Sequence, residues 1–117
     1  MQPLLALDRR QYPRRDARLM VSYRPMNPPG SYDITQTQNV SQGGILLTTA
    51  KAFEPGEQLA IQVRLPLWDS PRLVKGTAEA VECREIVRNL LYETRVRFVE
   101  LDRQTFQTFG NFCIGCR

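Results

Sequence analysis

The sequence predicts one all-β domain, an antiparallel β-barrel or β-sandwich of about six strands that ends in a helix. Its 117 residues are enough for a single hydrophobic core and too few for two. Short segments rich in β-branched and aromatic residues recur along the chain, and clusters of glycine and proline separate them. We expect this domain to occupy residues 18–112, with a flexible N-terminal arm at 1–17 and a C-terminal tail at 113–117.

The first three strands are expected in the N-terminal half. Residues Arg18–Arg24 favour a strand that ends at the turn Pro25–Gly30, because proline supplies no N–H donor to a sheet. Residues Tyr32–Val40 keep a β-branched or aromatic residue at many alternate positions, and the pair Gly43-Gly44 separates them from Ile45–Thr49. These last two segments are predicted to form a hairpin.

Three more strands and a helix are expected in the C-terminal half. Apolar residues occupy every second position of Leu59–Leu65, which predicts a strand with one buried face. The long segment Leu73–Val87 contains a glycine and predicts a strongly bent strand, and Tyr92–Leu101 alternates again. Asp102 is a candidate N-cap for a helix over Arg103–Phe112, which would flank the sheet or close one end of it.

The positive charge of the chain is concentrated near its N-terminus. Residues 1–24 contain six arginines and two aspartates, whereas residues 25–117 contain ten basic and ten acidic residues, so the net charge of +4 comes from the first segment. Only Lys51 and Lys75 among the sixteen basic residues are lysines. Because the planar guanidinium group matches phosphates and guanine edges, we expect a flat, anionic partner.

The remaining composition excludes several classes of function. The chain has no histidine, the commonest general base and metal ligand, so we expect no enzymatic activity. Cys113 and Cys116 have the spacing of a zinc site, but only Cys83 remains as a further cysteine ligand, so no metal or other cofactor is expected. The three cysteines form no disulfide framework, and no apolar run approaches the roughly 20 residues of a membrane helix. We therefore expect a cytoplasmic protein without membrane insertion.

Two short motifs carry the strongest functional signal. The first is Arg10-Gln11-Tyr12-Pro13-Arg14, with its arginines four positions apart, and the second is Asn39-Val40-Ser41-Gln42-Gly43-Gly44 at the predicted hairpin turn. Taken alone, the first is also typical of a solvated basic arm and the second of an ordinary Asx or serine turn. Together they would suit a small planar anion such as a nucleotide.

The order and spacing of these motifs resemble the two-part signature of PilZ domains, which is Arg-x-x-x-Arg followed by Asp/Asn-x-Ser-x-x-Gly. The later segment Arg97–Leu101 is similar to the end of an alternating strand in that family, and the resemblance covers about residues 9–109. It implies a six-stranded antiparallel barrel of Greek-key type in a bacterial protein. It also implies a receptor for the second messenger cyclic di-GMP.

The same resemblance implies roles for individual residues. Arg10 and Arg14 match its arginine pair and are expected to contact the phosphates or the guanine O6/N7 edges of cyclic di-GMP. Asn39 and Ser41 are expected to hold a guanine edge or a phosphate oxygen, and Gly44 to permit a positive φ and a close approach of backbone to ligand. The neighbouring candidates without a motif of their own are the possible phosphate helpers Arg9, Arg15 and Gly43.

Ligand binding is expected to order the arm across the barrel and so to change the surface offered to a downstream protein. Two alternatives stay open. A basic arm beside a β-surface is also typical of a small RNA-binding or DNA-binding barrel, although nucleic acid is the less expected partner. The chain would otherwise be a PilZ-like adaptor that contacts only proteins, which would leave both arginines and the serine without a role.

Overall fold

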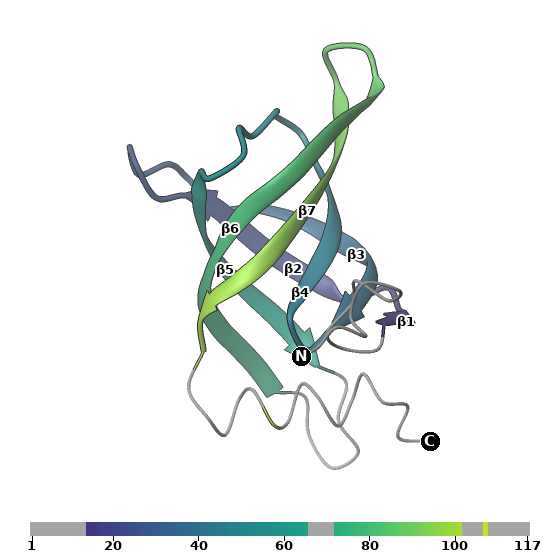
Figure 1. Cartoon of the computed structure of the whole chain (residues 1–117), viewed down its shortest axis with the longest axis vertical. Helices are drawn as coiled ribbons and strands as arrows, with labels where there is room; N and C mark the ends of the chain where they lie inside the picture. Colours follow the sequence, from purple (N-terminus) through teal and green to yellow (C-terminus); the bar gives the residue numbers. More distant parts are fainter. Residues whose placement is uncertain (1–13, 66–71, 102–106, 108–117) are drawn as a thin grey trace, which may run out of the picture.

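The computed structural model describes residues 14–65, 72–101 and 107, and these form an antiparallel β-barrel with one additional short strand (Figure 1). Within these residues no helix is long and apolar enough to cross a membrane. The strands in chain order are β1 (Arg14–Asp16), β2 (Met20–Pro25), β3 (Asp33–Ser41), β4 (Gly44–Thr49), β5 (Gln58–Leu65), β6 (Arg72–Val87) and β7 (Leu91–Glu100).

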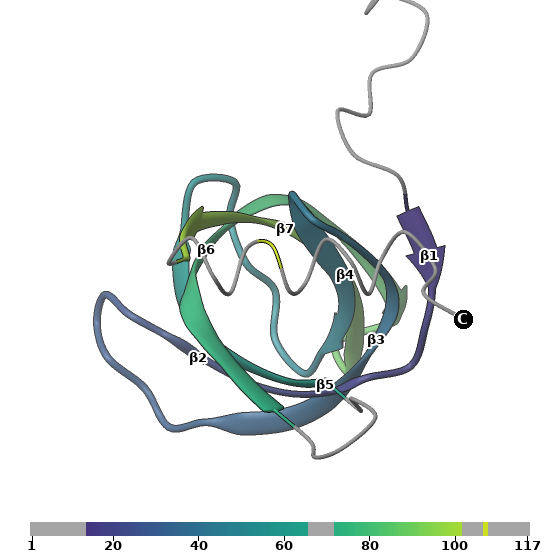
Figure 2. The same ribbon diagram turned by 90° about the horizontal axis from the view of Figure 1, so that it is seen from below.

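Six of the strands close into a barrel. They follow the order β3-β2-β5-β6-β7-β4, and a further pairing between β3 and β4 joins the two ends. Viewed along its axis, the barrel is a complete ring, and β1 lies outside this ring against β3 (Figure 2). Closure leaves no unpaired edge along the ring, which explains how so short a chain forms a stable sheet.

The structure confirms the predicted fold class and selects a barrel over a sandwich. The six expected strands correspond to β2–β7, and the predicted hairpin is the β3–β4 pair with its turn after Ser41. The helix expected over 103–112 lies outside the described residues except for Gln107, whose backbone is helical. The tail at 113–117, with Cys113 and Cys116, lies outside them as well.

The barrel interior is filled by the alternate residues that the sequence pattern assigns to one face of each strand. Two polar groups inside it have partners: the hydroxyls of Thr49 and Thr94 share a hydrogen bond of 2.8 Å. Burial raises the pKa of the Tyr23 phenol, whose oxygen accepts a hydrogen bond of 3.0 Å from the Ala50 N–H. The buried apolar side chains include Val21, Val40, Ile45, Leu47, Leu59, Ile61, Val63, Leu65, Val74 and Val96.

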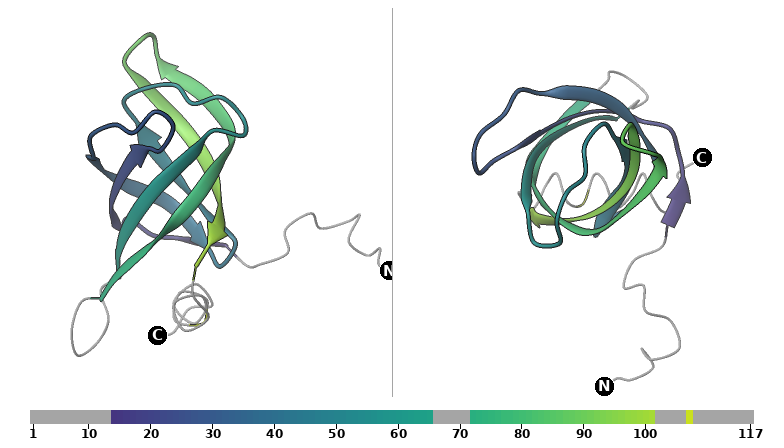
Figure 3. Two further views of the ribbon diagram at one scale, coloured as in Figure 1. Left: turned by 90° about the vertical axis from the view of Figure 1, so that its left-hand side faces the viewer. Right: turned by 90° about the horizontal axis from the view of Figure 1, so that it is seen from above.

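The β6–β7 hairpin extends well beyond the rim of the barrel (Figures 1 and 3). Two of its arginines are paired with carboxylates on the adjacent strand, in the Arg84–Glu93 ion pair and the longer Arg95–Glu82 pair at 3.9 Å. The hydrogen bond that Arg84 donates to the Glu93 carboxylate raises the pKa of its guanidinium. These pairs leave the charge of the hairpin largely balanced.

Candidate functional site

The short strand β1 lies beside the part of β3 that carries the second motif. Its register is antiparallel and pairs Arg14 with Ser41, Arg15 with Val40 and Asp16 with Asn39. Cross-strand partners share a face, so the second arginine of the first motif and the serine of the second are direct neighbours. The sheet therefore begins at Arg14, four residues before the domain boundary expected at Arg18, because β3 is longer than β2 and offers a free edge to the preceding segment.

The bend between β1 and β2 is held by one buried hydroxyl. Thr37 of β3 is fully buried, and its Oγ1 accepts a hydrogen bond of 2.9 Å from the Leu19 N–H and donates one of 2.6 Å to the Ala17 carbonyl. The Thr37 N–H in turn donates to the Leu19 carbonyl at 2.9 Å. These three bonds hold the backbone on both sides of Arg18. The exposed Arg18 side chain therefore extends from a fixed Cα position.

A β-bulge shapes the opposite wall. Thr37 pairs with Leu47 and Asn39 with Leu46, so Gln38 is an extra residue in β3 relative to β4. In a regular strand Gln38 and Asn39 would face opposite sides, but the bulge lets both line one hollow. The Gln38 amide also donates a hydrogen bond of 3.0 Å to the Thr48 hydroxyl.

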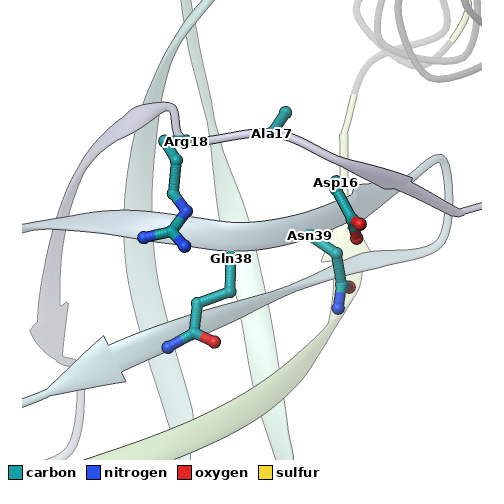
Figure 4. A pocket seen from close by; sticks show the side chains of 5 residues that line it. All are labelled: Asp16, Ala17, Arg18, Gln38 and Asn39. Atoms are coloured by element: carbon teal, nitrogen blue, oxygen red, sulfur yellow. The ribbon is translucent and has the colours of Figure 1, made fainter.

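The hollow between the bend and the bulge has a volume of about 420 Å³. Figure 4 shows the Arg18 guanidinium and the Gln38 amide on one side of it, with the Asp16 carboxylate and the Asn39 amide on the other. Such a volume lies within the range of about 300–1,000 Å³ that is usual for small-molecule sites. Its walls offer cationic and amide donors together with amide and carboxylate acceptors, a combination that matches a polar heterocycle bearing phosphates. The residues that line it are Asp16, Ala17, Arg18, Gln38 and Asn39.

Ser41 builds the turn next to this hollow. Its Oγ accepts hydrogen bonds from the Gly43 and Gly44 N–H groups and donates one to the Gly44 carbonyl, each at 3.2 Å. A hydroxyl has one proton and two lone pairs, so these three bonds use its full capacity. A hydrogen bond that Ser41 donates to a ligand would therefore replace the one that it donates to the Gly44 carbonyl.

The structure gives Gly44 a different reason to be glycine from the one expected. A positive φ was expected there, but among the described glycines only Gly56 has one. A Cβ at Gly44 would overlap the Val96 carbonyl oxygen and lie 2.9 Å from the Arg97 Cα, because β7 packs directly against this point of β4. The expectation of a positive φ was wrong, and close approach to β7 explains this glycine.

The predicted site residues are thus brought together in part. Arg14, Asn39, Ser41 and Gly44 gather where β1, β3 and β4 meet, and Gly43 lies in the same turn, with its carbonyl accepting a hydrogen bond of 2.8 Å from Phe98. Arg15 is paired with Val40 and so lies on the opposite face of β1 from Arg14. The remaining two candidates, Arg9 and Arg10, lie outside the described residues.

Three polar residues of the hollow were not expected from the sequence. Arg18 has one signal in the sequence, because Arg14 and Arg18 repeat the four-residue spacing of Arg10 and Arg14. Asp16 and Gln38 have none, since their positions follow from the extra strand and from the bulge. In the part of the chain that the structure describes, no group of three or more acidic or cysteine residues is arranged to hold a metal ion.

Comparison with known proteins identifies the family. The model of the PilZ domain family matches residues 8–115. The structure of the Bacillus subtilis inhibitor of motility (MotI/DgrA) is 28% identical with a TM-score of 0.81, and the match covers 92% of this chain and 50% of that one. The chain therefore spans half the length of this relative.

The PilZ domain of Escherichia coli YcgR, solved with c-di-GMP, is 18% identical with a TM-score of 0.68, over 92% of this chain and 90% of that one. A second YcgR structure, in complex with c-di-GMP, is 17% identical with a TM-score of 0.69, and the match covers 91% of this chain and 45% of that one. A search of curated proteins gives no match. The family model spans nearly the whole chain, so the chain belongs to the PilZ domain family.

Proposed function

We propose that this chain is a non-enzymatic, cytoplasmic receptor for cyclic di-GMP. The observation that carries the proposal is the β1–β3 register: Arg14 is opposite Ser41, and the next pair on the same face, Asp16 and Asn39, lines the hollow together with Arg18. Membership of the PilZ family and the c-di-GMP in the two YcgR structures support the choice of ligand.

In this proposal, guanidinium groups provide most of the recognition. Arg18 lines the hollow, Arg14 lies opposite Ser41 on β1, and Arg10, four residues before Arg14, would supply a third arginine. Arginine forks bind phosphate oxygens or the O6/N7 edge of guanine through paired hydrogen bonds. Arg9 is a further phosphate helper, whereas Arg15 fits this role less well because it lies on the other face of β1.

The amide of Asn39 completes the polar edge of the site. It both donates and accepts hydrogen bonds, so it is able to read the mixed donor and acceptor edge of guanine without adding negative charge. Ser41 and Gly43 hold the turn that supports this amide, and Gly44 keeps the turn close to β7. Ordering of the segment that carries Arg10 over the hollow would then alter the surface that a downstream protein contacts.

Calorimetric titration of the protein with cyclic di-GMP and with cyclic di-AMP tests the proposal. We expect binding of the guanine ligand only, because adenine lacks the O6 acceptor. The variants Arg10→Ala and Arg14→Ala should lose most of the affinity, while Arg88→Ala, an exposed arginine of the β6–β7 hairpin, serves as the matched control. Ligand should raise the melting temperature, because at a concentration of 100 times Kd it adds about 2.7 kcal/mol to the free energy of unfolding. Identical titrations for wild type and the first two variants would refute the site.

A further inference from the structure

The outer face of the sheet formed by β3, β2, β5 and β6 is basic and partly apolar. Every second residue of these strands points into the barrel and is buried, as are Val21, Ile61, Val63 and Val74. Because side chains alternate along a strand, the residues between them point outward. The register aligns them across the strands: Gln36 with Met20, Ile34 with Ser22, Ser22 with Gln62, Gln62 with Lys75 and Arg64 with Leu73. We define the basic sheet face as Met20, Arg24, Ile34, Arg64, Leu73 and Lys75.

The charge of the basic sheet face is not neutralised. Arg64 and Lys75 are exposed, and neither forms an ion pair with a described residue, whereas Arg84, Arg95 and Arg97 are each paired with a glutamate. The cross-strand pairs that run from Gln36 and Ile34 to Lys75 contain no aspartate or glutamate, and Glu79, opposite Gln58 on the same face of β6, is already ion-paired with Arg97. A partner that meets this face therefore gains most by presenting carboxylates.

Aliphatic side chains are exposed between these charges. Ile34 is 71% exposed, Leu73 52% and Met20 45%, all on the regular strand wall of the barrel. Exposed aliphatic residues interspersed with arginine are typical of protein interfaces, where methionine and arginine are enriched.

Nucleic acid fits this face less well. Stacking platforms for bases need open aromatic rings, and Tyr32 beside this face has the Arg24 guanidinium over its ring at 5.4 Å from the centroid.

We propose that the basic sheet face docks a protein whose contact surface carries carboxylates around exposed aliphatic side chains. This inference deepens the proposed receptor function and rests on it, because a receptor without an enzymatic output acts through a partner. The face begins two residues after Arg18 at Met20, so the site and the docking surface share strand β3 and adjoin where the bend enters β2.

Selection of peptides from a random phage-displayed library on the immobilised full chain, with and without cyclic di-GMP, tests the proposal. We expect the selected peptides to combine aspartate or glutamate with leucine, isoleucine or phenylalanine. Synthetic copies should bind the double variant Arg64→Glu/Lys75→Glu at least tenfold more weakly than wild type. The control Lys51→Glu/Arg88→Glu makes the same change in net charge elsewhere on the exposed surface and should leave the affinity unchanged.

A second pair of variants tests the apolar part. Ile34→Ser should weaken the same peptides, whereas Leu90→Ser, a 67% exposed residue of the β6–β7 hairpin, should not. Equal effects of either face variant and its control would overturn the proposal, as would selected peptides without carboxylates. Retention of a uridine-rich RNA 20-mer, or of vesicles containing phosphatidylserine, that is lost only in Arg64→Glu/Lys75→Glu would assign the face to another class of partner.

Cyclic di-GMP titrations of the same variants separate this inference from the proposed function. Both double variants should keep the wild-type affinity for the nucleotide, since none of their residues lines the hollow. Acidic peptides that bind a chain unable to bind cyclic di-GMP would leave the docking surface standing and refute the receptor role. Nucleotide binding without any face-dependent peptide would refute the docking surface alone.

Discussion

Replacing Thr37 by valine is expected to destabilise the barrel and to loosen the candidate site at the same time. The threonine hydroxyl joins β3 to the bend between β1 and β2 through bonds to the Leu19 N–H and the Ala17 carbonyl. Valine has nearly the same shape but neither donates nor accepts a hydrogen bond. The substitution therefore removes both bonds while the core around it stays filled.

The size of the effect follows from the burial of the two partners. Leu19 is a buried residue, and leaving its N–H without an acceptor costs roughly 1–3 kcal/mol. The Ala17 carbonyl is half-buried and is able to bond water, so its loss adds little. The extra methyl group offsets about 0.8 kcal/mol. We expect a net loss of about 1–2 kcal/mol in the free energy of unfolding.

Urea unfolding followed by circular dichroism measures this loss. With a slope of about 1–3 kcal/mol/M for a small domain, the midpoint should fall by about 1 M without a change in slope. Thr35→Val is the matched control, because Thr35 lies on the same strand and its hydroxyl has no hydrogen bond to another described residue. An equal fall for both variants, or none for Thr37→Val, would refute the role given to this hydroxyl. Cyclic di-GMP should also bind Thr37→Val more weakly than Thr35→Val.

Three other changes test separate features. Arg18→Ala should lower the affinity for cyclic di-GMP at least about tenfold in calorimetry without lowering the melting temperature, and an unchanged affinity would remove Arg18 from the site. Gly44→Ala should cost at least about 2 kcal/mol in urea unfolding, since its Cβ meets the backbone of β7, and a wild-type midpoint would contradict that packing. Burial raises the pKa of folded Tyr23, so above pH 10.0 the unfolded chain ionises first and wild type should lose stability relative to Tyr23→Phe. A stability difference that stays constant from neutral pH to above 10.0 would argue against this shift.

The barrel was predictable from the sequence because its strands have a simple period. Inward and outward residues alternate clearly in Leu59–Leu65 and Tyr92–Leu101, and the clusters Pro25–Gly30 and Gly43-Gly44 mark where strands stop. Strand β1 was not predictable in this way. Three residues with two arginines and an aspartate have no β-favouring pattern, and they pair only because β3 extends past β2 and leaves an edge uncovered.

Candidate site residues were predictable from the sequence only where they belong to one of the two motifs. Arg14, Asn39 and Ser41 were candidates because the two motifs resemble a known signature, and the register brings these three positions together. Gln38 was missed because a bulge depends on how two strands are aligned, which no local pattern records. The reason given for Gly44 failed on similar grounds, since the strand that excludes its side chain lies about fifty residues away in the sequence.

The bend between β1 and β2 connects the two functional surfaces proposed for this domain. Thr37 fixes Ala17 and Leu19 on either side of Arg18, and Met20, the first residue of β2, belongs to the basic sheet face. A ligand that displaces Arg18 therefore displaces the backbone of the bend, which ends at Leu19, directly before the docking surface begins at Met20. If ligand binding shifts that segment between two positions with different affinity for the acidic partner, linkage requires the partner to raise the affinity for cyclic di-GMP by the same factor. Thr37→Val should uncouple the two, because it frees the segment through which either site would bias the other.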